Sequence, residues 1–257
     1  MDPSQLIESL TALVGADKVS GEGSDIEEHS IDKWLVGHPP DAVVFAESTK
    51  DVVAVMKFSH QEGVPVTTRG AGVGYVGGAV PVRGGIVLSV ARMNSIKEIN
   101  IEDGVAVVGS GLITGTLQDA TRDLGWFYPP DPASLEECSI GGNVATNAGG
   151  PRCLKYGVTR NYILGLEVVL ADGTVARLGG RCHKNKTGFD LIGMFVGSEG
   201  LLGVVTEVTC RLIPYPPARA MVSATFETFA DAVQKMVDTH REKHLPNLDR
   251  TLIKVRP

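Results

Sequence analysis

The sequence predicts an α+β fold in which helices flank largely antiparallel sheets. Two pairs of short apolar segments are separated by the tight-turn sequences Glu102-Asp103-Gly104 and Asp172-Gly173. Turns of this kind typically join the two strands of a β-hairpin. A single β-α-β unit, at residues 43–68, precedes both hairpins. Because hairpins dominate, the pattern favours an α+β fold over a doubly wound parallel sheet.

The β-α-β unit lies in the first part of the chain. Ser48 and Asp51 have the spacing of a helix capping pattern, and apolar residues follow on one helical face. Gly63 can end this helix. The elements expected here are a helix at 4–14 ended by Gly15, an irregular polar segment at 15–41, a strand at 43–45, the helix between Ser48 and Gly63, and strands at 64–68 and 86–90.

The rest of the chain contains both hairpins and two segments of unusual composition. Residues 128–134 hold too many prolines for a regular element. Small residues dominate 139–150, so this segment must pack very close to a neighbour. The elements expected here are strands at 96–101 and 105–108, a helix at 114–124 ended by Gly125, strands at 164–171, 174–178 and 202–213, and a helix at 226–240.

A glycine-rich loop at residues 67–78, with the sequence TTRGAGVGYVGG, directly follows an apolar segment. Five of its residues are glycine, which permits positive φ angles and close approach of the backbone to a ligand. Successive N–H groups in such a turn can converge on an anion, most often a phosphate. A mobile surface loop is the alternative interpretation.

Part of this loop, Gly72 to Gly77, also fits the G-x-G-x-x-G fingerprint of a Rossmann fold. That fingerprint requires a helix that opens on the loop. Pro81 and the pair Gly84-Gly85 would break such a helix in its first turns. A second glycine pair, in Gly109-Ser110-Gly111, lacks a third glycine at the required spacing. The sequence therefore favours a loop that holds a phosphate group with its own amides.

Composition limits the classes of partner. The chain has 257 residues and a net charge of −6, and it lacks a block of Lys or Arg that would indicate nucleic acid or an anionic membrane surface. It also lacks an apolar run of about 18 residues, so we expect no transmembrane segment. The N-terminus does not have the pattern of a signal peptide. Four widely spaced cysteines, Cys138, Cys153, Cys182 and Cys210, are expected to be reduced, as in a cytoplasmic protein.

Several single residues have a functional and a structural interpretation. His240 and His244 have metal-ligand spacing on a helix, but an exposed helix end is favoured because no third ligand is evident. A run at 184–190 with two lysines and Asp190 is equally consistent with a solvated loop. His183 would need to lie near the reacting atoms to act as a base, and Tyr156 is consistent with either a cofactor contact or core packing.

Four ordered blocks together resemble the FAD-binding domain of the vanillyl-alcohol-oxidase type, also called the PCMH-type domain. Within that group the chain is most similar to the FAD subunit of glycolate oxidase and to D-lactate and D-2-hydroxyacid dehydrogenases. The resemblance covers roughly residues 38–217. The blocks are Arg69 to Gly78, Pro129 to Ser134, Ser139 to Gly150 with Lys155-Tyr156-Gly157, and Gly197 to Val205.

The resemblance implies a two-subdomain FAD-binding domain with non-covalent FAD. It divides the chain into an N-terminal helix and irregular arm at 1–37, a first FAD-binding subdomain at 38–94, a second at 95–217, and the start of a truncated substrate domain at 218–257. A covalent link is not expected because the loop has no His beside its glycines. Val73 stands where family members commonly have Thr or Ser, so backbone amides would have to suffice for phosphate binding.

The same resemblance implies which residues bind the cofactor. The glycine loop would contribute Arg69, Gly70, Ala71, Gly72, Val73, Gly74, Tyr75, Gly77 and Gly78, with the pyrophosphate on the amides of 70–75 and the flavin ring near the last two glycines. Pro130, Asp131, Pro132 and Ser134 would line the ring and ribityl chain. Ile140, Gly141, Gly142, Thr146, Asn147 and Gly149 would pass beside the pyrophosphate and flavin, and Glu199, Gly200, Gly203 and Val204 would approach the adenosine half.

The activity that the resemblance implies is hydride transfer from a D-2-hydroxy acid, such as glycolate or D-lactate, to flavin N5. Electrons would pass to an acceptor subunit or a quinone, and a partner could hold this cytoplasmic protein peripherally at a membrane. The alternative is a flavin-binding module or fragment that needs a substrate domain or a partner chain for turnover. A reductase of the enolpyruvyl type is a third reading, which the Pro-Pro-Asp-Pro-Ala-Ser block disfavours.

Overall fold

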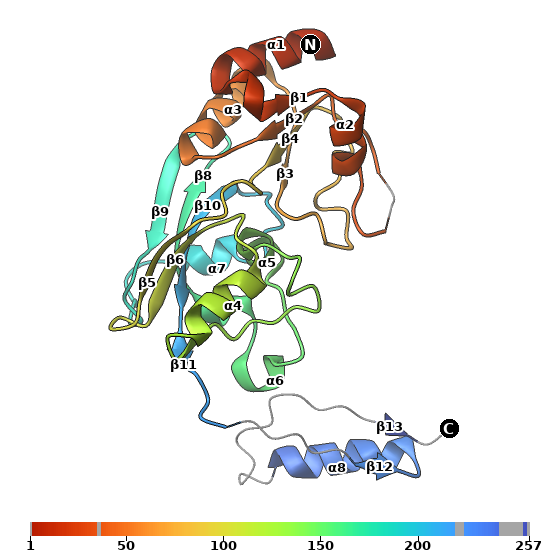
Figure 1. The fold of residues 1–257 in the computed structure, drawn as a ribbon, viewed down its shortest axis with the longest axis vertical. Coiled ribbons are helices and arrows are strands. Elements are labelled where there is room, and N and C mark those ends of the chain that lie inside the picture. The colour runs from red at the N-terminus through yellow and green to blue at the C-terminus, as the bar shows by residue number, and fades with distance from the viewer. Residues whose placement is uncertain (1, 35–36, 219–223, 242–253, 256–257) are drawn as a thin grey trace.

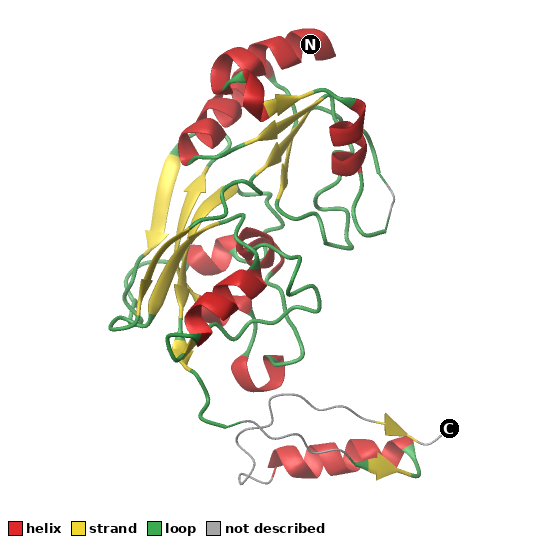
Figure 2. Ribbon diagram, viewed as in Figure 1, coloured by secondary structure: helices red, strands yellow, loops and turns green. Residues whose placement is uncertain are grey.

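The computed structural model describes residues 2–34, 37–218, 224–241 and 254–255, and two sheets with flanking helices form its body (Figures 1 and 2). The helices are α1 (Pro3–Val14), α2 (Gly23–Ser30), α3 (Thr49–Glu62), α4 (Thr114–Arg122), α5 (Ile140–Thr146), α6 (Cys153–Tyr156), α7 (Leu191–Phe195) and α8 (Phe229–Arg241), with 3-10 turns η1 (Ala16–Lys18) and η2 (Thr159–Tyr162). The strands are β1 (Val19–Ser20), β2 (Ala42–Phe45), β3 (Val66–Arg69), β4 (Ile86–Ser89), β5 (Ile96–Asn100), β6 (Val105–Gly109), β7 (Trp126–Phe127), β8 (Ile163–Val169), β9 (Val175–Gly179), β10 (Val204–Arg211), β11 (Ile213–Pro214), β12 (Thr225–Phe226) and β13 (Lys254–Val255).

The first sheet has the strand order β1-β2-β4-β3. Its three longer strands are parallel, with Val87 of β4 opposite Val43 on one side and Thr67 on the other. The two-residue strand β1 is antiparallel to β2 at one edge. This sheet contains the predicted β-α-β unit, and the glycine-rich loop leaves it at the carboxyl end of β3.

The second sheet is antiparallel throughout, in the order β5-β6-β10-β8-β9. Both predicted hairpins are confirmed. Gly173 in the turn between β8 and β9 has φ 81°, and Gly104 between β5 and β6 has φ 64°, angles that favour glycine. The predicted α+β class, with antiparallel sheets and flanking helices, is therefore confirmed.

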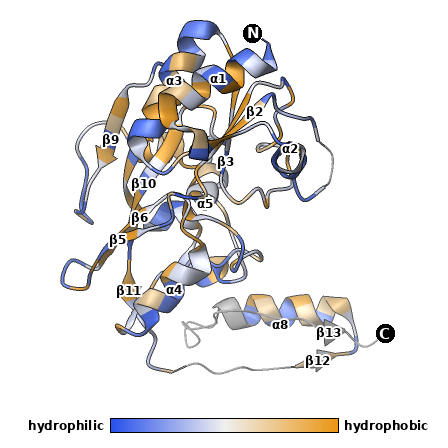
Figure 3. Ribbon diagram, turned by 45° about the horizontal axis from the view of Figure 1, so that its top comes forward, coloured by the Kyte–Doolittle hydropathy of each residue, from blue (hydrophilic) through white to orange (hydrophobic). Residues whose placement is uncertain are grey.

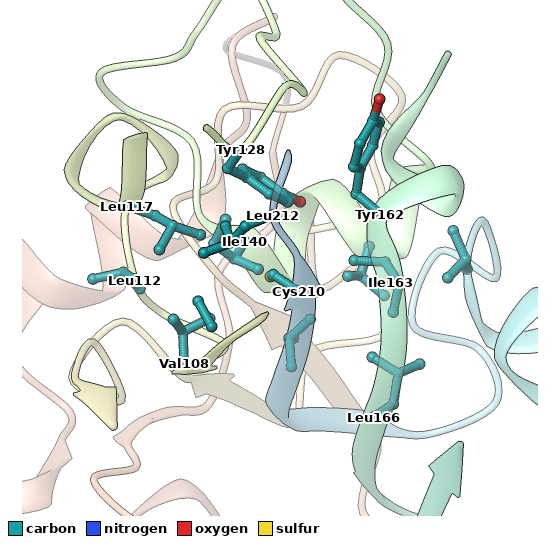
Figure 4. Packing of buried hydrophobic residues seen from close by; sticks show 14 of the residues in the cluster. Val108, Leu112, Leu117, Tyr128, Ile140, Tyr162, Ile163, Leu166, Cys210 and Leu212 are labelled. Atoms are coloured by element: carbon teal, nitrogen blue, oxygen red, sulfur yellow. The ribbon is translucent and has the colours of Figure 1, made fainter. Parts of the chain in front are cut away.

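One buried cluster fills the space between the second sheet and the helices α4 and α5. Figure 4 shows Tyr128 and Leu212 beside Ile140 and Cys210 in this cluster. Burial raises the pKa of the Cys210 thiol to about 12. All four cysteines are free, and Cys210 is a packing thiol, in line with the sequence interpretation.

A second cluster joins the two sheets through α3. It contains Val52 and Val55 of α3 together with apolar residues of the first sheet. It also contains Val169 of β8 and Val204 of β10, which belong to the second sheet. In Figure 3 the strands behind α1 and α3 are coloured as apolar segments. The two sheets thus share a core, with α3 between them.

The segment at 15–41 was expected to be irregular, and this expectation is wrong. It contains β1 and the helix α2. The α2 sequence is mostly polar, and His29 is its one fully buried residue among those that the structure describes. Hydrophobic periodicity is therefore too weak to indicate a helix, and tertiary contacts determine the conformation. The small-residue block likewise contains a short helix, α5, that the sequence reading did not predict.

The N-terminus of α3 is a polar junction between the two sheets. The predicted capping box is present, with Ser48 accepting from the Asp51 amide. Thr49 donates at 2.7 Å to the Glu167 carboxylate of β8, which also accepts from Thr206 Oγ1 at 3.0 Å. Arg177 lies 2.6 Å from the same carboxylate. Burial by itself would raise the pKa of Glu167, but these hydrogen bonds and the nearby positive charges outweigh it, so the pKa lies below its usual value.

No helix in the described ranges combines the length and apolar character needed to cross a bilayer.

Glu167 gives the stability of the fold an acid-dependent component. Because its folded-state pKa is lowered, its contribution is complete above the unfolded value of about 4.3 and is lost as pH falls through the folded value. We expect Glu167→Gln to lower the free energy of unfolding at pH 7 by about 1–3 kcal/mol, and the difference from the wild type to shrink below about pH 4. Urea unfolding at several pH values measures this. Glu102→Gln, at an exposed turn position, is the control, and a difference that does not change with pH would contradict the assignment.

Candidate functional site

The glycine loop extends from the end of β3 with its backbone amides available. Within the described residues, the N–H groups of 71–76 donate no hydrogen bond. Residues 74–78 are exposed, and residues 70–73 are half-buried. A run of adjacent free donors on a glycine-rich turn is the arrangement that binds a phosphate group.

The glycines of this loop are required for different reasons. Gly72 and Gly77 have φ angles of 68° and 78°, which disfavour other residues. Gly72 would also collide with the Arg69 guanidinium if it carried a side chain. Gly74 has neither constraint, because its φ is not positive and no atom lies within 4 Å of an added Cβ. The protein itself therefore imposes no steric requirement for a glycine at position 74.

Arg69 was predicted as a cofactor-binding residue, and the structure places its side chain beneath the loop. The guanidinium donates to Ile31 O at 2.7 Å, Ala79 O at 3.3 Å and Glu28 O at 3.3 Å. Burial lowers the pKa of this side chain, while the charges of Glu28 and Asp32 oppose the shift. The side chain therefore holds the loop against α2 and the segment that follows it.

Helix α5 lies next to the glycine loop and is packed as closely as the sequence predicts. Ser139 caps α5 by accepting from the Gly142 amide at 3.2 Å. A Cβ on Gly70 would collide with the Ser139 hydroxyl. On the other side, a Cβ on Gly141 would lie 2.7 Å from Ser110 Cβ. The start of α5 and the start of the glycine loop therefore face the same region.

The proline-rich segment packs against the end of the small-residue block. Gln118 of α4 donates to Tyr128 O at 2.9 Å and to Pro130 O at 2.7 Å, which fixes the path of the segment. Asp131 accepts from the Arg152 amide at 3.2 Å and pairs with its guanidinium at 3.1 Å. A Cβ on Gly150 would collide with Asp131 O. Pro130 and Pro132 are buried, so their role is to shape the backbone.

The fourth block begins beside the other end of α5. Gly197 N donates to Val144 O at 2.9 Å, and Glu199 N donates to Ala145 O at 2.8 Å. Glu199 has φ 53°, and its carboxylate lies 3.2 Å from where a Gly78 Cβ would be. The glycine loop, α5 and the Glu199 turn therefore form one continuous surface.

The structure thus brings all four blocks together around α5, although individual residues differ in accessibility. Those with exposed positions are Gly74, Tyr75, Gly77, Gly78, Thr146, Gly149 and Glu199. Those that are half-buried are Gly70, Ala71, Gly72, Val73, Asp131, Ser134, Gly142, Asn147, Gly200 and Gly203. Those that are buried are Arg69, Pro130, Pro132, Ile140, Gly141 and Val204.

Several rival candidates lie elsewhere. His183 contacts Asp103 O at 3.1 Å, at the turn of the β5–β6 hairpin. Asp190 pairs with Arg160 at 2.6 Å, and the Tyr156 ring packs edge-on against Phe127. The His240 side chain and all of His244 lie outside the described residues. Among the residues that are described, no group of His, Cys, Asp and Glu could hold a metal ion.

Two surface hollows also lie away from the glycine loop. One, of about 410 Å³, is next to the start of α3 and is lined by Ser48, Lys97 and Thr206, among other residues. The other, of about 550 Å³, lies between the end of β9 and α7 and is lined by residues of the 182–192 segment. The open face of the four blocks is therefore a surface distinct from these hollows.

Two residues that touch this surface were missed from the sequence. Asp32 accepts from the Gly77 amide at 3.0 Å, although it lies in the arm that was expected to be irregular. No local sequence pattern links Asp32 to the loop, because it lies 45 residues before Gly77. Ser110 was noted in the sequence only as part of Gly109-Ser110-Gly111, which does not fit the dinucleotide motif. In the structure it packs directly against Gly141.

Comparison with known proteins agrees with this geometry. The sequence model of the family described as FAD binding domain matches residues 40–179. Glycolate oxidase subunit GlcD of Bacillus subtilis is 43% identical over 207 residues, 80% of this chain and 44% of that protein. D-lactate dehydrogenase of Archaeoglobus fulgidus is 43% identical over 204 residues, 79% of this chain and 45% of that protein. The chain therefore spans less than half the length of these curated relatives.

A solved structure is also similar. The crystal structure of p-cresol methylhydroxylase with substrate bound has a TM-score of 0.79 and 27% identity, and the match covers 95% of this chain and 50% of that chain.

The close packing at Gly141 predicts a cost for any side chain there. We expect Gly141→Ala to lower the free energy of unfolding by about 1–3 kcal/mol, because the new Cβ would lie 2.7 Å from Ser110 Cβ and 2.8 Å from Ser110 O. Gly74→Ala should change it by less than about 0.5 kcal/mol, because that position is open. Chemical denaturation measures both variants. Equal stability of the two would show that α5 does not pack as described.

Proposed function

The chain belongs to the FAD binding domain family, and from this we propose that the glycine loop, α5 and the segments packed around them hold FAD non-covalently. The observation that carries the proposal is the combination of free amides at 71–76 with an unconstrained glycine at position 74. Converging amides suit the pyrophosphate, and the bare Gly74 backbone leaves room for close approach of the ligand.

The four blocks would divide the cofactor between them. The amides of 70–75 would hold the pyrophosphate, with the start of α5 beside it. Gly77 and Gly78, the 130–134 segment and residues 140–149 would border the flavin, and the segment from Glu199 to Val204 would approach the adenosine half. Val73 has no hydroxyl to donate to the phosphate, so affinity in this part of the site depends on backbone N–H groups.

We further propose the domain division that the two sheets suggest. The first subdomain, at 38–94, contains the parallel strands β2, β3 and β4 and supplies the glycine loop. The second, at 95–217, contains the antiparallel sheet and supplies the other three blocks. Residues 1–37 form an arm on the first subdomain, and 218–257 begin a further domain. The cofactor would then bind where the two subdomains meet at α5.

The activity we propose is that of an FAD-dependent dehydrogenase for a D-2-hydroxy acid such as glycolate or D-lactate. Bound FAD would accept hydride from the carbon that carries the hydroxyl group. The substrate class is inferred from the two relatives, a glycolate oxidase subunit and a D-lactate dehydrogenase. A separate subunit or a quinone would take the electrons, and a cytoplasmic location, with membrane contact through a partner, fits this arrangement.

A flavin-binding module without turnover of its own is the second candidate. It is favoured by the state of the titratable side chains on the proposed surface. The Arg69 guanidinium is held by three backbone carbonyls, and the Asp131 carboxylate is held by Arg152. Neither of these two side chains offers a free acid or base to a substrate, which leaves the exposed Glu199 beside Gly78 as the carboxylate on this surface that a substrate could reach.

Flavin retention tests the proposed site. We expect the purified protein to take up FAD and to show the visible absorption of a flavoprotein. Gly74→Val should abolish retention, because its side chain would occupy the space above the loop amides, while the unfolding free energy changes by less than about 0.5 kcal/mol. Gly180→Val is the matched control, since Gly180 also has no atom within 4 Å of an added Cβ and lies after β9. A Gly74→Val protein that retains FAD would show that the loop is misassigned.

Anaerobic addition of D-lactate or glycolate separates the two candidate functions. For the dehydrogenase we expect the visible flavin absorption of the FAD-loaded chain to bleach, because substrate hydride reduces the ring. L-lactate is the control for stereochemistry. Unchanged absorption in a protein that retains FAD would favour the module.

A further inference from the structure

The segment after α2 contacts the glycine loop through hydrogen bonds to Gly74 and Gly77. Asp32 is buried, with 6% of its surface exposed. Its Oδ2 accepts a hydrogen bond from Gly77 N at 3.0 Å. Through Oδ1 it accepts from Trp34 N at 2.8 Å. One carboxylate therefore joins a turn of the arm to the far end of the loop.

Three other contacts tie the same two segments together. Lys33 N donates to Gly74 O at 3.3 Å. The Arg69 guanidinium, at the near end of the loop, donates to Glu28 O and Ile31 O of the arm and to Ala79 O beyond the loop. The loop is thus attached at its start, its middle and its end, and each attachment leaves the amides of 71–76 free.

One of these contacts sets the direction of a free amide. No peptide bond in the described chain is cis. In a trans peptide, the C=O of one residue and the N–H of the next point in opposite directions. Because Gly74 O faces the Lys33 amide, the Tyr75 N–H points away from the arm, toward the exposed side of the loop. The Lys33 contact of the arm therefore sets the direction of the Tyr75 amide, which is one of the free donors of the loop.

We propose that Asp32 is a positioning residue for the diphosphate of FAD, which it orients through the glycine loop without touching the ligand. This inference rests on the proposed cofactor site. A loop that is already in its binding conformation loses less entropy when the ligand binds, so affinity rises. A carboxylate suits this role because both of its oxygens are acceptors, and each faces one backbone N–H.

Asparagine at position 32 keeps the size of the side chain but removes one acceptor oxygen and the negative charge near Arg69. Its amide has one acceptor oxygen and one donor NH₂ group, so one of the two backbone N–H groups loses its partner. Asp41, an exposed residue of the first subdomain, offers a comparison. Its Oδ2 accepts from Gly85 N at 2.6 Å, a carboxylate-to-glycine contact at the other end of β4 from the loop.

The experiment compares Asp32→Asn and Asp41→Asn with the wild type in titrations of the whole chain with FAD and with ADP. ADP carries the diphosphate without the flavin. We expect Asp32→Asn to raise the Kd for both ligands about tenfold or more, by similar factors, and Asp41→Asn to leave both within about twofold. Unfolding free energies of the two variants are measured alongside. Similar losses of stability with different losses of affinity would support positioning.

The outcomes separate this inference from the proposed function. A wild-type chain that binds FAD, together with an Asp32→Asn chain of equal affinity, overturns the role of Asp32 and leaves the site intact. Equal weakening by both variants, or weakening for FAD but not for ADP, also overturns it. A wild type without FAD affinity overturns the proposed function itself. If Asp32→Asn does not fold, hydrogen exchange of the wild type decides: a Gly77 amide that exchanges as fast as in an unstructured peptide would overturn the proposal.

Discussion

Direct backbone contact around α5 is the constraint on which the rest of the structure depends. At Gly70, Gly141 and Gly150 the neighbouring chain lies so close that a Cβ would collide with a side chain or a carbonyl. Gly70 and Gly141 mark where α5 meets the glycine loop and the end of β6, and Gly150 marks where the end of the small-residue block meets the proline-rich segment. Because the segments come from both sheets, this contact also fixes how the sheets meet. The result is a surface made from four distant parts of the sequence.

The sequence predicted those features that local chemistry determines. Ser48 and Asp51 form the expected capping box, and Gly173 occupies the turn that the hairpin requires. The close packing of the 139–150 block was also predictable from its small residues. In contrast, α2 and α5 were missed because their sequences lack apolar periodicity, and α5 is rich in glycine, which disfavours helices. A serine cap and tertiary packing hold α5 in place, and neither has a strong local signature.

The glycines of the family blocks have two kinds of role, which the sequence alone could not separate. Gly141 is required by the protein, because Ser110 occupies the space of its missing side chain. Gly74 is not required by the protein, because no atom lies within 4 Å of an added Cβ. Arg69 shows the converse case: a residue in a binding motif whose side chain supports the loop from beneath. The contribution of Asp32 could not be predicted, since no local pattern links it to a loop 45 residues later in the chain.

The shared core between the sheets has a consequence for cooperativity. Helix α3 packs on the first sheet and also on Val169 and Val204 of the second, and the Glu167 junction lies at the same place. Neither sheet can lose its packing without exposing apolar surface of the other, so the two should melt in a single transition. A ligand bound only to the native state stabilises it by mass action. Occupancy of a small loop at the end of β3 would therefore protect strands as remote as β9 from thermal unfolding and proteolysis.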